Sequence, residues 1–298
     1  MASGWVNPMI FATGLSFPEG PVFLPDRTWL VVEMGPTRGC VTQIGADGQT
    51  KRIIARTGRP NGLAVDRDGI IWVAESRTPS LLRLTLEGRA EVFATGCAGE
   101  PFLFPNDLCL GPDGALYMTD SGIRFEDWKP GGRLRADYLE TPTDGRVYRI
   151  DIKTRNVTKL DSGIRFTNGI AFGPDQRLYV NETLTGMVYR YEWQGGGIFG
   201  RREDFGNVLD STGPEGYKGP DGMAFGENGK LFVTVFGQGD VTVLGKDGCV
   251  AERIRTTGRR PSNVAFGARG EKKIYVTECE LGQLEVFDVG TDGLPLYA

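Results

Sequence analysis

The sequence contains no histidine among its 298 residues. This absence excludes catalytic sites built on a Ser-His-Asp triad or a Cys-His pair, zinc sites with histidine ligands, and reactions that need an imidazole base. Chemistry near neutral pH would therefore depend on carboxylates, Lys, Tyr, Cys or a bound metal ion.

Cysteine is scarce as well, and no Cys-x-x-Cys pair occurs. An odd number of widely spaced thiols fits free cysteines in a reducing compartment better than a disulfide framework or a thiolate zinc site. Cys109 lies in the apolar run DLCLG, so we interpret it as a packed core thiol and not as a nucleophile. The five cysteines are Cys40, Cys97, Cys109, Cys249 and Cys279.

Long apolar runs and a surplus of positive charge are also missing. No run approaches the ~20 residues of a membrane-spanning helix, and the N-terminus lacks the basic segment and apolar core of a secretory signal. The net charge of −4 offers no basic surface for nucleic acid or an anionic membrane. We therefore expect neither partner, and we expect the protein to reside in the cytoplasm.

What the sequence does contain is a segment that recurs six times. Each unit has an alternating or apolar strand, a polar turn that usually holds Asp or Gly, and a second strand rich in β-branched and aromatic residues. A third run and usually a fourth follow, such as LLRLTLEG and AEVFATG. Four strands per about 40–50 residues, repeated, are typical of a β-propeller blade. The units begin at Phe17, Arg59, Phe104, Phe166, Gly219 and Arg260.

We therefore predict an all-β fold, a six-bladed β-propeller with four-stranded blades, that forms a single domain over residues 1–298. The sixth unit ends after its third strand, whereas PMIFATGL, before the first unit, is similar to the fourth-strand segment AEVFATGC. The N-terminal strand is thus predicted to close the last blade. Closure of this kind leaves no open sheet edge.

Alignment of the units places one polar residue of each just before the first strand. In a propeller this strand lines the central channel, so the six side chains should converge at one mouth. Turn formation explains any single Asn, Asp or Ser, but Glu has no such preference. Oxygen ligands without histidine or thiolate suit a hard divalent cation such as Ca²⁺. This first column contains Glu19, Asn61, Asn106, Asn168, Asp221 and Ser262.

A second column lies at the end of the second strand, which returns to the same face. For each of its acids we favour a structural interpretation, in which the carboxylate accepts hydrogen bonds from backbone N–H groups of neighbouring blades. Asp120 has the strongest case for function, because a long insertion follows it. The column contains Glu33, Glu75, Asp120, Glu182, Val235 and Glu278.

The insertion spans residues 122–145 and carries Phe125, Trp128 and Tyr138. Long loops in compact domains are usually functional or mobile, so we predict that this segment is a lid over the mouth. The segment 205–219, which precedes Asp221, is expected on the same face as a second wall.

Five stretches together resemble the SMP-30/gluconolactonase/LRE-like family of calcium-dependent six-bladed propellers, which includes sugar lactonases and regucalcin. The resemblance covers essentially the whole chain. The stretches are FPEGPVF, RPNGLAVD, FPNDLCLGPDGALYMTDSG, FTNGIAFGPD and GPDGMAFGENGKLFV.

The resemblance implies a single divalent cation bound in the channel by Glu19, Asn168 and Asp221. Asn106 matches a residue that ligates the metal in some members and contacts substrate in others. Asp221 matches the proposed general base or water-activating group. Ca²⁺ is favoured, and Zn²⁺, Mn²⁺, Mg²⁺ and Fe²⁺ remain open. The expected substrate contacts are Asn61, Asn106, Asp107, Asp120, Phe104 and Trp128.

Two departures bear on the substrate. Phe104 stands where sugar lactonases often carry an Arg, which favours a less polar pocket than an aldonolactone needs. The phosphotriesterase branch carries a pocket histidine, which this chain lacks.

The leading hypothesis is a metal-dependent hydrolase that opens a lactone by water attack. The alternatives are a non-catalytic, metal-binding interaction module and a phosphoester or aryl-ester hydrolase at the same site. The expected partner is a small-molecule lactone or ester, and both a monomer and a homodimer remain open.

Overall fold

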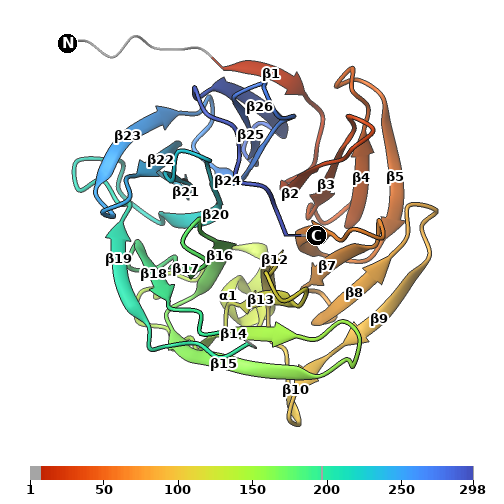
Figure 1. Ribbon diagram of the computed structural model, residues 1–298, viewed down its shortest axis with the longest axis vertical. Helices are drawn as coiled ribbons and strands as arrows, with labels where there is room; N and C mark the ends of the chain where they lie inside the picture. The colour runs from red at the N-terminus through yellow and green to blue at the C-terminus, as the bar shows by residue number, and fades with distance from the viewer. Residues whose placement is uncertain (1–7, 196, 298) are drawn as a thin grey trace.

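The computed structural model describes residues 8–195 and 197–297. Six four-stranded antiparallel sheets surround a central channel (Figure 1), which confirms the predicted all-β, six-bladed propeller. The helical segments of the described residues are α1 (Phe125–Trp128) and the 3₁₀ turn η1 (Pro130–Gly132), both within the insertion. No helix in these ranges is long and apolar enough to cross a membrane.

The blades follow one another along the chain, each running from the channel outwards. Blade 1 contains β2 (Pro18–Phe23), β3 (Trp29–Glu33), β4 (Cys40–Ile44) and β5 (Lys51–Arg56). Blade 2 contains β6 (Pro60–Val65), β7 (Ile71–Glu75), β8 (Ser80–Leu84) and β9 (Ala90–Ala94). A small hairpin of β10 (Gly96–Cys97) and β11 (Glu100–Pro101) follows. Blade 3 contains β12 (Pro105–Leu110), β13 (Leu116–Asp120), β14 (Gly145–Ile150) and β15 (Val157–Ile164).

The other three blades repeat this order. Blade 4 contains β16 (Thr167–Phe172), β17 (Leu178–Glu182), β18 (Met187–Tyr191) and β19 (Glu203–Asn207). Blade 5 contains β20 (Gly219–Phe225), β21 (Leu231–Phe236), β22 (Asp240–Leu244) and β23 (Val250–Arg255). Blade 6 contains β24 (Pro261–Phe266), β25 (Lys273–Glu278), β26 (Gln283–Asp288) and β1 (Met9–Ala12).

Blade 6 is completed by the N-terminal strand, as the sequence predicts. β1 pairs antiparallel with β26, and Figure 1 shows these two strands side by side near the rim. Ala12 is 1% exposed and belongs to an apolar cluster with Trp29 of blade 1 and Tyr275 of blade 6. The closing strand is therefore part of the core that joins the first blade to the last.

The core consists of apolar layers between successive blades. One cluster joins Leu30 and Val32 of blade 1 to Leu63 and Val73 of blade 2. The inner strands β2, β6, β12, β16, β20 and β24 lie beside one another around the ring. The residues just before and at the start of these strands therefore gather around one mouth of the channel.

A bulge at the start of each inner strand changes the direction of the side chains that face this mouth. In every blade the pairing of the inner strand with the next strand shifts register near the third and fourth residues of the unit. The fourth residue is Gly in four blades, and a Cβ on Gly169 would lie 2.3 Å from the carbonyl oxygen of Asp221. Glycine thus allows neighbouring inner strands to approach closely. The four are Gly20, Gly62, Gly169 and Gly222.

Closure by β1 can be tested with one buried and one exposed substitution in the same strand. Ala12→Asp would bury an unpaired carboxylate in the cluster with Trp29, and we expect it to lower the free energy of unfolding by about 3 kcal/mol. Met9→Asp is the matched control, because Met9 is 58% exposed. Urea denaturation measures both, and equal effects of the two substitutions would contradict a structural role for β1.

Candidate metal centre

The first-column side chains lie around one mouth of the channel and are almost fully buried. Glu19, Asn61, Asn106, Asn168 and Ser262 are between 1% and 6% exposed. Asp221 keeps part of its surface exposed. It is therefore the acid of the column that solvent can reach.

Two of the asparagines are oriented by the residue that follows the second strand of their own blade. The Asn106 amide donates to Ser121 Oγ at 2.9 Å, and Ser121 donates to the Thr167 carbonyl at 3.0 Å. The Asn168 amide donates to Thr183 Oγ1 at 3.3 Å, in the corresponding position of the next blade. Each amide nitrogen is thus tied to the scaffold, which leaves the side-chain oxygen for another partner.

For Asn168 that partner is missing. Its Oδ1 is buried and accepts no hydrogen bond from the described residues. A buried acceptor without a donor is costly, and a cation satisfies it as well as a donor does. This orphan oxygen is the observation that best fits a metal ligand.

Three carboxylates lie close together in the same region. Burial raises the pKa of Glu19 well above its ordinary value, and repulsion from Asp221 and Asp107 raises it further. Burial likewise raises the pKa of Asp107 to about 7 and that of Asp221 to about 8. No Lys or Arg within the described ranges forms an ion pair with any of the three. The ionised form of the cluster therefore lacks a positive partner within the protein, and a divalent cation would stabilise it.

The donor set fits a hard cation. It combines carboxylates with amide oxygens, which is the chemistry that Ca²⁺ prefers. In the described part of the chain no group of three or more His, Cys, Asp or Glu side chains is arranged to hold a metal. The ring could bind one through its mixture of acids and amides.

A further polar residue, Asn263, lies just below the ring and was not predicted from the sequence. Its amide donates to Glu19 Oε2 at 2.9 Å and to Asp107 Oδ2 at 3.5 Å. Asp107 and Asn263 are the two residues that replace glycine at the fourth position of the units. A Cβ on Gly222 would lie 2.0 Å from the Asn263 side chain, so glycine in one blade makes room for the polar residue of the next.

The second column has a structural role. Its acids accept backbone N–H groups from the segment that leads into the inner strand of their own blade. The prediction of backbone acceptors is thus correct, but the donors are not in neighbouring blades. The bonds run to Glu33 from Ser16, to Glu75 from Arg59, to Asp120 from Leu103 and Phe104, to Glu182 from Arg165, and to Glu278 from Arg260.

Asp120 follows this pattern. It has no exposed surface, and it accepts bonds from Leu103, Phe104 and Gly122 at 2.7, 3.0 and 2.9 Å. The structure therefore places it in the scaffold beneath the insertion and not at a surface that substrate could contact. Its function there is to hold Phe104 and the residues after it in position.

Aromatic side chains cover the ring. Trp128 of the insertion is 1% exposed and packs on Phe166, with ring centroids 4.7 Å apart, and on Tyr217 at 6.0 Å. Phe104 packs on Phe166 and on Phe125 at 5.9 and 5.7 Å. Phe104 and Trp128 are thus brought together above the ring, where a lid would lie. Whether the insertion moves stays a prediction.

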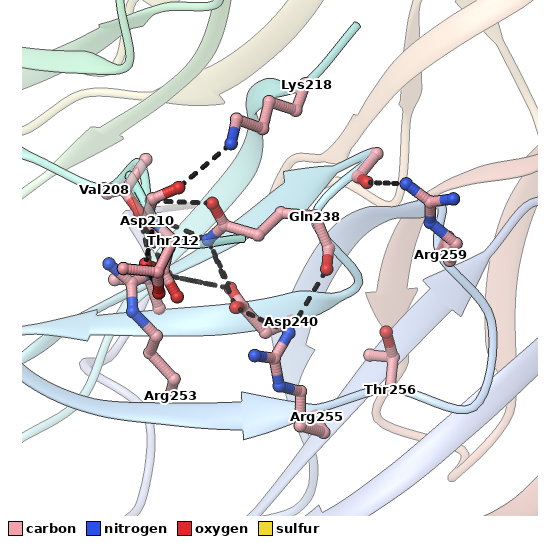
Figure 2. Close-up of polar contacts among 12 residues, drawn as sticks. Val208, Asp210, Thr212, Lys218, Gln238, Asp240, Arg253, Arg255, Thr256 and Arg259 are labelled. Carbon is pink, nitrogen blue, oxygen red and sulfur yellow. Dashed lines mark hydrogen bonds and ion pairs between the residues drawn. The ribbon is translucent and has the colours of Figure 1, made fainter. Parts of the chain in front are cut away.

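The segment before Asp221 is anchored by a polar network in blade 5 (Figure 2). Gln238 accepts from the Asp210 N–H at 2.8 Å and donates to Asp240 at 3.1 Å, and Lys218 Nζ donates to the Asp210 carbonyl at 2.9 Å. Asp240 is fully buried and lies 3.5 Å from Arg255. The network fixes the wall that carries Tyr217 and leads to Asp221.

On the opposite side of the polar layer lies a cavity of about 460 Å³. Its walls are the apolar faces of the inner strands, and Asp107 and Asn263 border it. The C-terminal residues 292–297 cross its far end, where Figure 1 shows the chain ending at the centre of the ring. The polar layer therefore lies between the lid-side mouth and this cavity.

Comparison with known proteins gives consistent matches over nearly the whole chain. The region described as SMP-30/gluconolactonase/LRE-like matches residues 17–280. The gluconolactonase of Zymomonas mobilis is 26% identical over 280 residues, which cover 88% of this chain and 76% of that protein. The diisopropyl-fluorophosphatase of Loligo vulgaris is 27% identical over 300 residues, with coverage of 94% and 91%.

Solved structures give the same result. A gluconolactonase from Xanthomonas campestris aligns with a TM-score of 0.76 at 26% identity, over 96% of this chain and 89% of that one. The calcium-binding protein regucalcin from Agrobacterium tumefaciens aligns with a TM-score of 0.79 over 99% and 98%. Its identity of 20% shows a shared fold.

The pKa shifts predict how the metal-free protein responds to pH. Because the pKa values of Asp107 and Asp221 are raised to about 7 and about 8, the folded state retains protons that the unfolded state has lost. Their contribution to stability is complete below about pH 4 and is lost as pH rises through about 8. Thermal unfolding in EDTA should therefore show a melting temperature that falls between about pH 6 and about pH 8.5.

The absence of histidine simplifies this measurement, because no imidazole titrates in the same range. Asp107→Asn should make the melting temperature in EDTA fall less steeply with pH. Asp68→Asn, at an exposed turn, should leave this pH dependence unchanged. A melting temperature that rises with pH in EDTA would contradict the raised pKa values of the clustered acids Asp107 and Asp221.

Proposed function

Since the chain belongs to the SMP-30/gluconolactonase/LRE-like family, as its motifs predict, we propose that it hydrolyses lactones at the polar ring with a divalent cation bound there. The relatives named gluconolactonase support the reaction class. The observation that supports the site is the cluster of three acids, two of them buried and one partly exposed, beside the orphan oxygen of Asn168. The proposed cation is Ca²⁺, in keeping with oxygen-only ligands.

Glu19, Asn106, Asn168 and Asp221 are the residues that would hold the cation. When bound, a divalent cation supplies Lewis-acid polarisation of the lactone carbonyl and stabilises the charge that develops on its oxygen. Proton transfer, substrate binding and exclusion of water are the proposed roles of the protein's own side chains.

Asp221 is proposed as the general base. It is the partly exposed acid of the ring, so a water molecule can reach it. Asp221 takes a proton from this water as the water oxygen attacks the carbonyl carbon. The bond between that carbon and the ring oxygen then breaks, and the proton passes to the leaving oxygen to give the hydroxy acid. Burial raises the pKa of Asp221 to about 8 in the metal-free protein, while hydrogen bonding to Asn168 and the charge of Lys129 oppose this rise. A divalent cation bound beside it would favour the ionised, basic form further.

Two other groups have proposed supporting roles. Asn61 and Asn106 lie in the same column and would hold oxygen atoms of the substrate. The aromatic cover of Phe104 and Trp128 would exclude bulk water during the reaction and limit which substrates fit.

A second candidate function is phosphoester hydrolysis at the same ring. The similarity to the fluorophosphatase of Loligo vulgaris, which covers 94% of this chain, supports it. Phosphoester and aryl-ester substrates therefore belong in the same assay. A protein that binds the cation but turns over none of these substrates would instead be the non-catalytic module.

The cation can be tested by binding and by activity together. We expect Ca²⁺ to raise the melting temperature, EDTA to abolish lactone turnover, and Asn168→Leu to remove both the thermal shift and the turnover. Asn181 is also buried, with an unpartnered oxygen, but its amide hydrogen-bonds the Asp221 carbonyl. Asn228→Leu, at an exposed turn, is therefore the better control. Turnover that survives complete removal of divalent ions would contradict the proposal.

The base can be tested separately. At saturating Ca²⁺, Asp221→Asn should lower kcat for γ- and δ-lactones by about 10²–10⁴-fold, because an amide cannot accept the proton. Asp247→Asn, at an exposed turn, provides a matched loss of one carboxylate. Asp221→Asn with wild-type kcat and intact Ca²⁺ binding would rule out Asp221 as the base.

A further inference from the structure

Arginine and aromatic side chains surround the mouth above the metal centre. The first residues of the units form this rim, with phenylalanine at Phe17, Phe104 and Phe166 and arginine at Arg59 and Arg260. The guanidinium carbon of Arg59 lies 3.4 Å from the ring centroid of Phe125, and that of Arg260 lies 6.0 Å from the centroid of Phe236. Both charges are thus positioned against aromatic rings.

The insertion adds a third cation. Lys129 follows α1 directly, and its ammonium lies 5.7 Å from the ring centroid of Phe17 and 5.8 Å from that of Phe125. Burial lowers the pKa of Lys129, and the charges that act on it include Asp221, Arg260 and Arg59. The insertion therefore places an amine close enough to both arginines and to Asp221 for their charges to interact.

These cations have little compensation from the protein. In residues 8–195 and 197–297, no carboxylate lies within 4.0 Å of the charged group of Lys129 or Arg260. Arg59 pairs with Glu126 at 3.4 Å, but Glu126 is 66% exposed, and exposed pairs contribute little. Three like charges among aromatic rings repel one another, and an anion placed between them would relieve that repulsion.

We propose that this mouth selects lactones that carry an anionic group, which Arg59, Lys129 and Arg260 hold, while the surrounding rings contact the apolar part of the molecule. The inference rests on the proposed lactonase function and specifies its substrate class. Phe104 packs on Phe125 and Phe166 and so supports the apolar character of the mouth.

The acids below do not supply the missing anion. Glu19, Asp107 and Asp221 carry three negative charges at most, and the proposed divalent cation neutralises two of them. The three mouth cations then exceed the remaining charge, even with Glu126 included. A substrate anion completes the balance when it binds.

The test uses the full-length protein loaded with Ca²⁺ and a matched pair of substrates. 5-Oxotetrahydrofuran-2-carboxylate and its primary amide share the lactone ring and differ in one negative charge. We expect kcat/KM to be at least about tenfold higher for the carboxylate, mainly through KM, and the ratio to fall as KCl is added. The lactams pyroglutamate and pyroglutamamide, which resist hydrolysis, provide the same comparison by calorimetry.

Substitutions at the mouth test whether its three cations cause the preference for the carboxylate substrate. Arg260→Met, Lys129→Met and Arg59→Met should each reduce the preference for the carboxylate, and Arg260→Lys should restore part of it. Lys51→Met removes the same charge from the outer strand β5, where Lys51 is exposed, and should leave the preference unchanged. A preference retained in all three mouth variants would overturn the assignment.

The two proposals fail in different ways. If both lactones are hydrolysed equally well and pyroglutamate binds no better than its amide, the anion selection is wrong and the lactonase function stands. If neither these nor neutral γ- and δ-lactones are hydrolysed, the lactonase function fails. In that case the lactam comparison still decides whether the mouth prefers an anion.

Discussion

The proposed site depends on three carboxyl groups that are held close together at the axis of the propeller. Glu19, Asp107 and Asp221 are brought together from three different blades, and burial raises the pKa of all three. A fold tolerates such a cluster only if something offsets the desolvation and repulsion. The orphan oxygen of Asn168 indicates the same missing partner. The proposed divalent cation would account for both features, and the catalytic proposal follows from it.

The repeat explains how these residues meet. The third residue of each unit is polar, the inner strand bulges there, and in four blades the fourth residue is glycine, so that the six inner strands converge without collision. In five of the six blades, an acid at the end of the second strand holds the chain that leads into the inner strand. The structural acids and the proposed metal ligands thus come from the same repeated unit. The closing strand β1 keeps the first and last blades in contact, which maintains the geometry of the ring.

The sequence was sufficient to predict this framework, because blades, closure and first column are all expressed in local periodicity. It could not give the position of Asn263, because that position depends on a contact across blades. The signal available in the sequence was that Asp107 and Asn263 replace the glycine found at the fourth position of the other four units. Lys129 could not be placed either, since the path of the insertion is set by the packing of Trp128 on Phe166 and Tyr217. For Asp120 the insertion suggested a functional role, but its backbone partners show a structural one.

The most direct measurement is anomalous diffraction from crystals grown with a divalent cation such as Mn²⁺ or Ca²⁺. We predict one strong peak on the channel axis, about 2.1–2.6 Å from oxygen atoms of Glu19, Asn106, Asn168 and Asp221. A structure at saturating cation with no peak inside this ring, or with the peak outside it, would contradict the account.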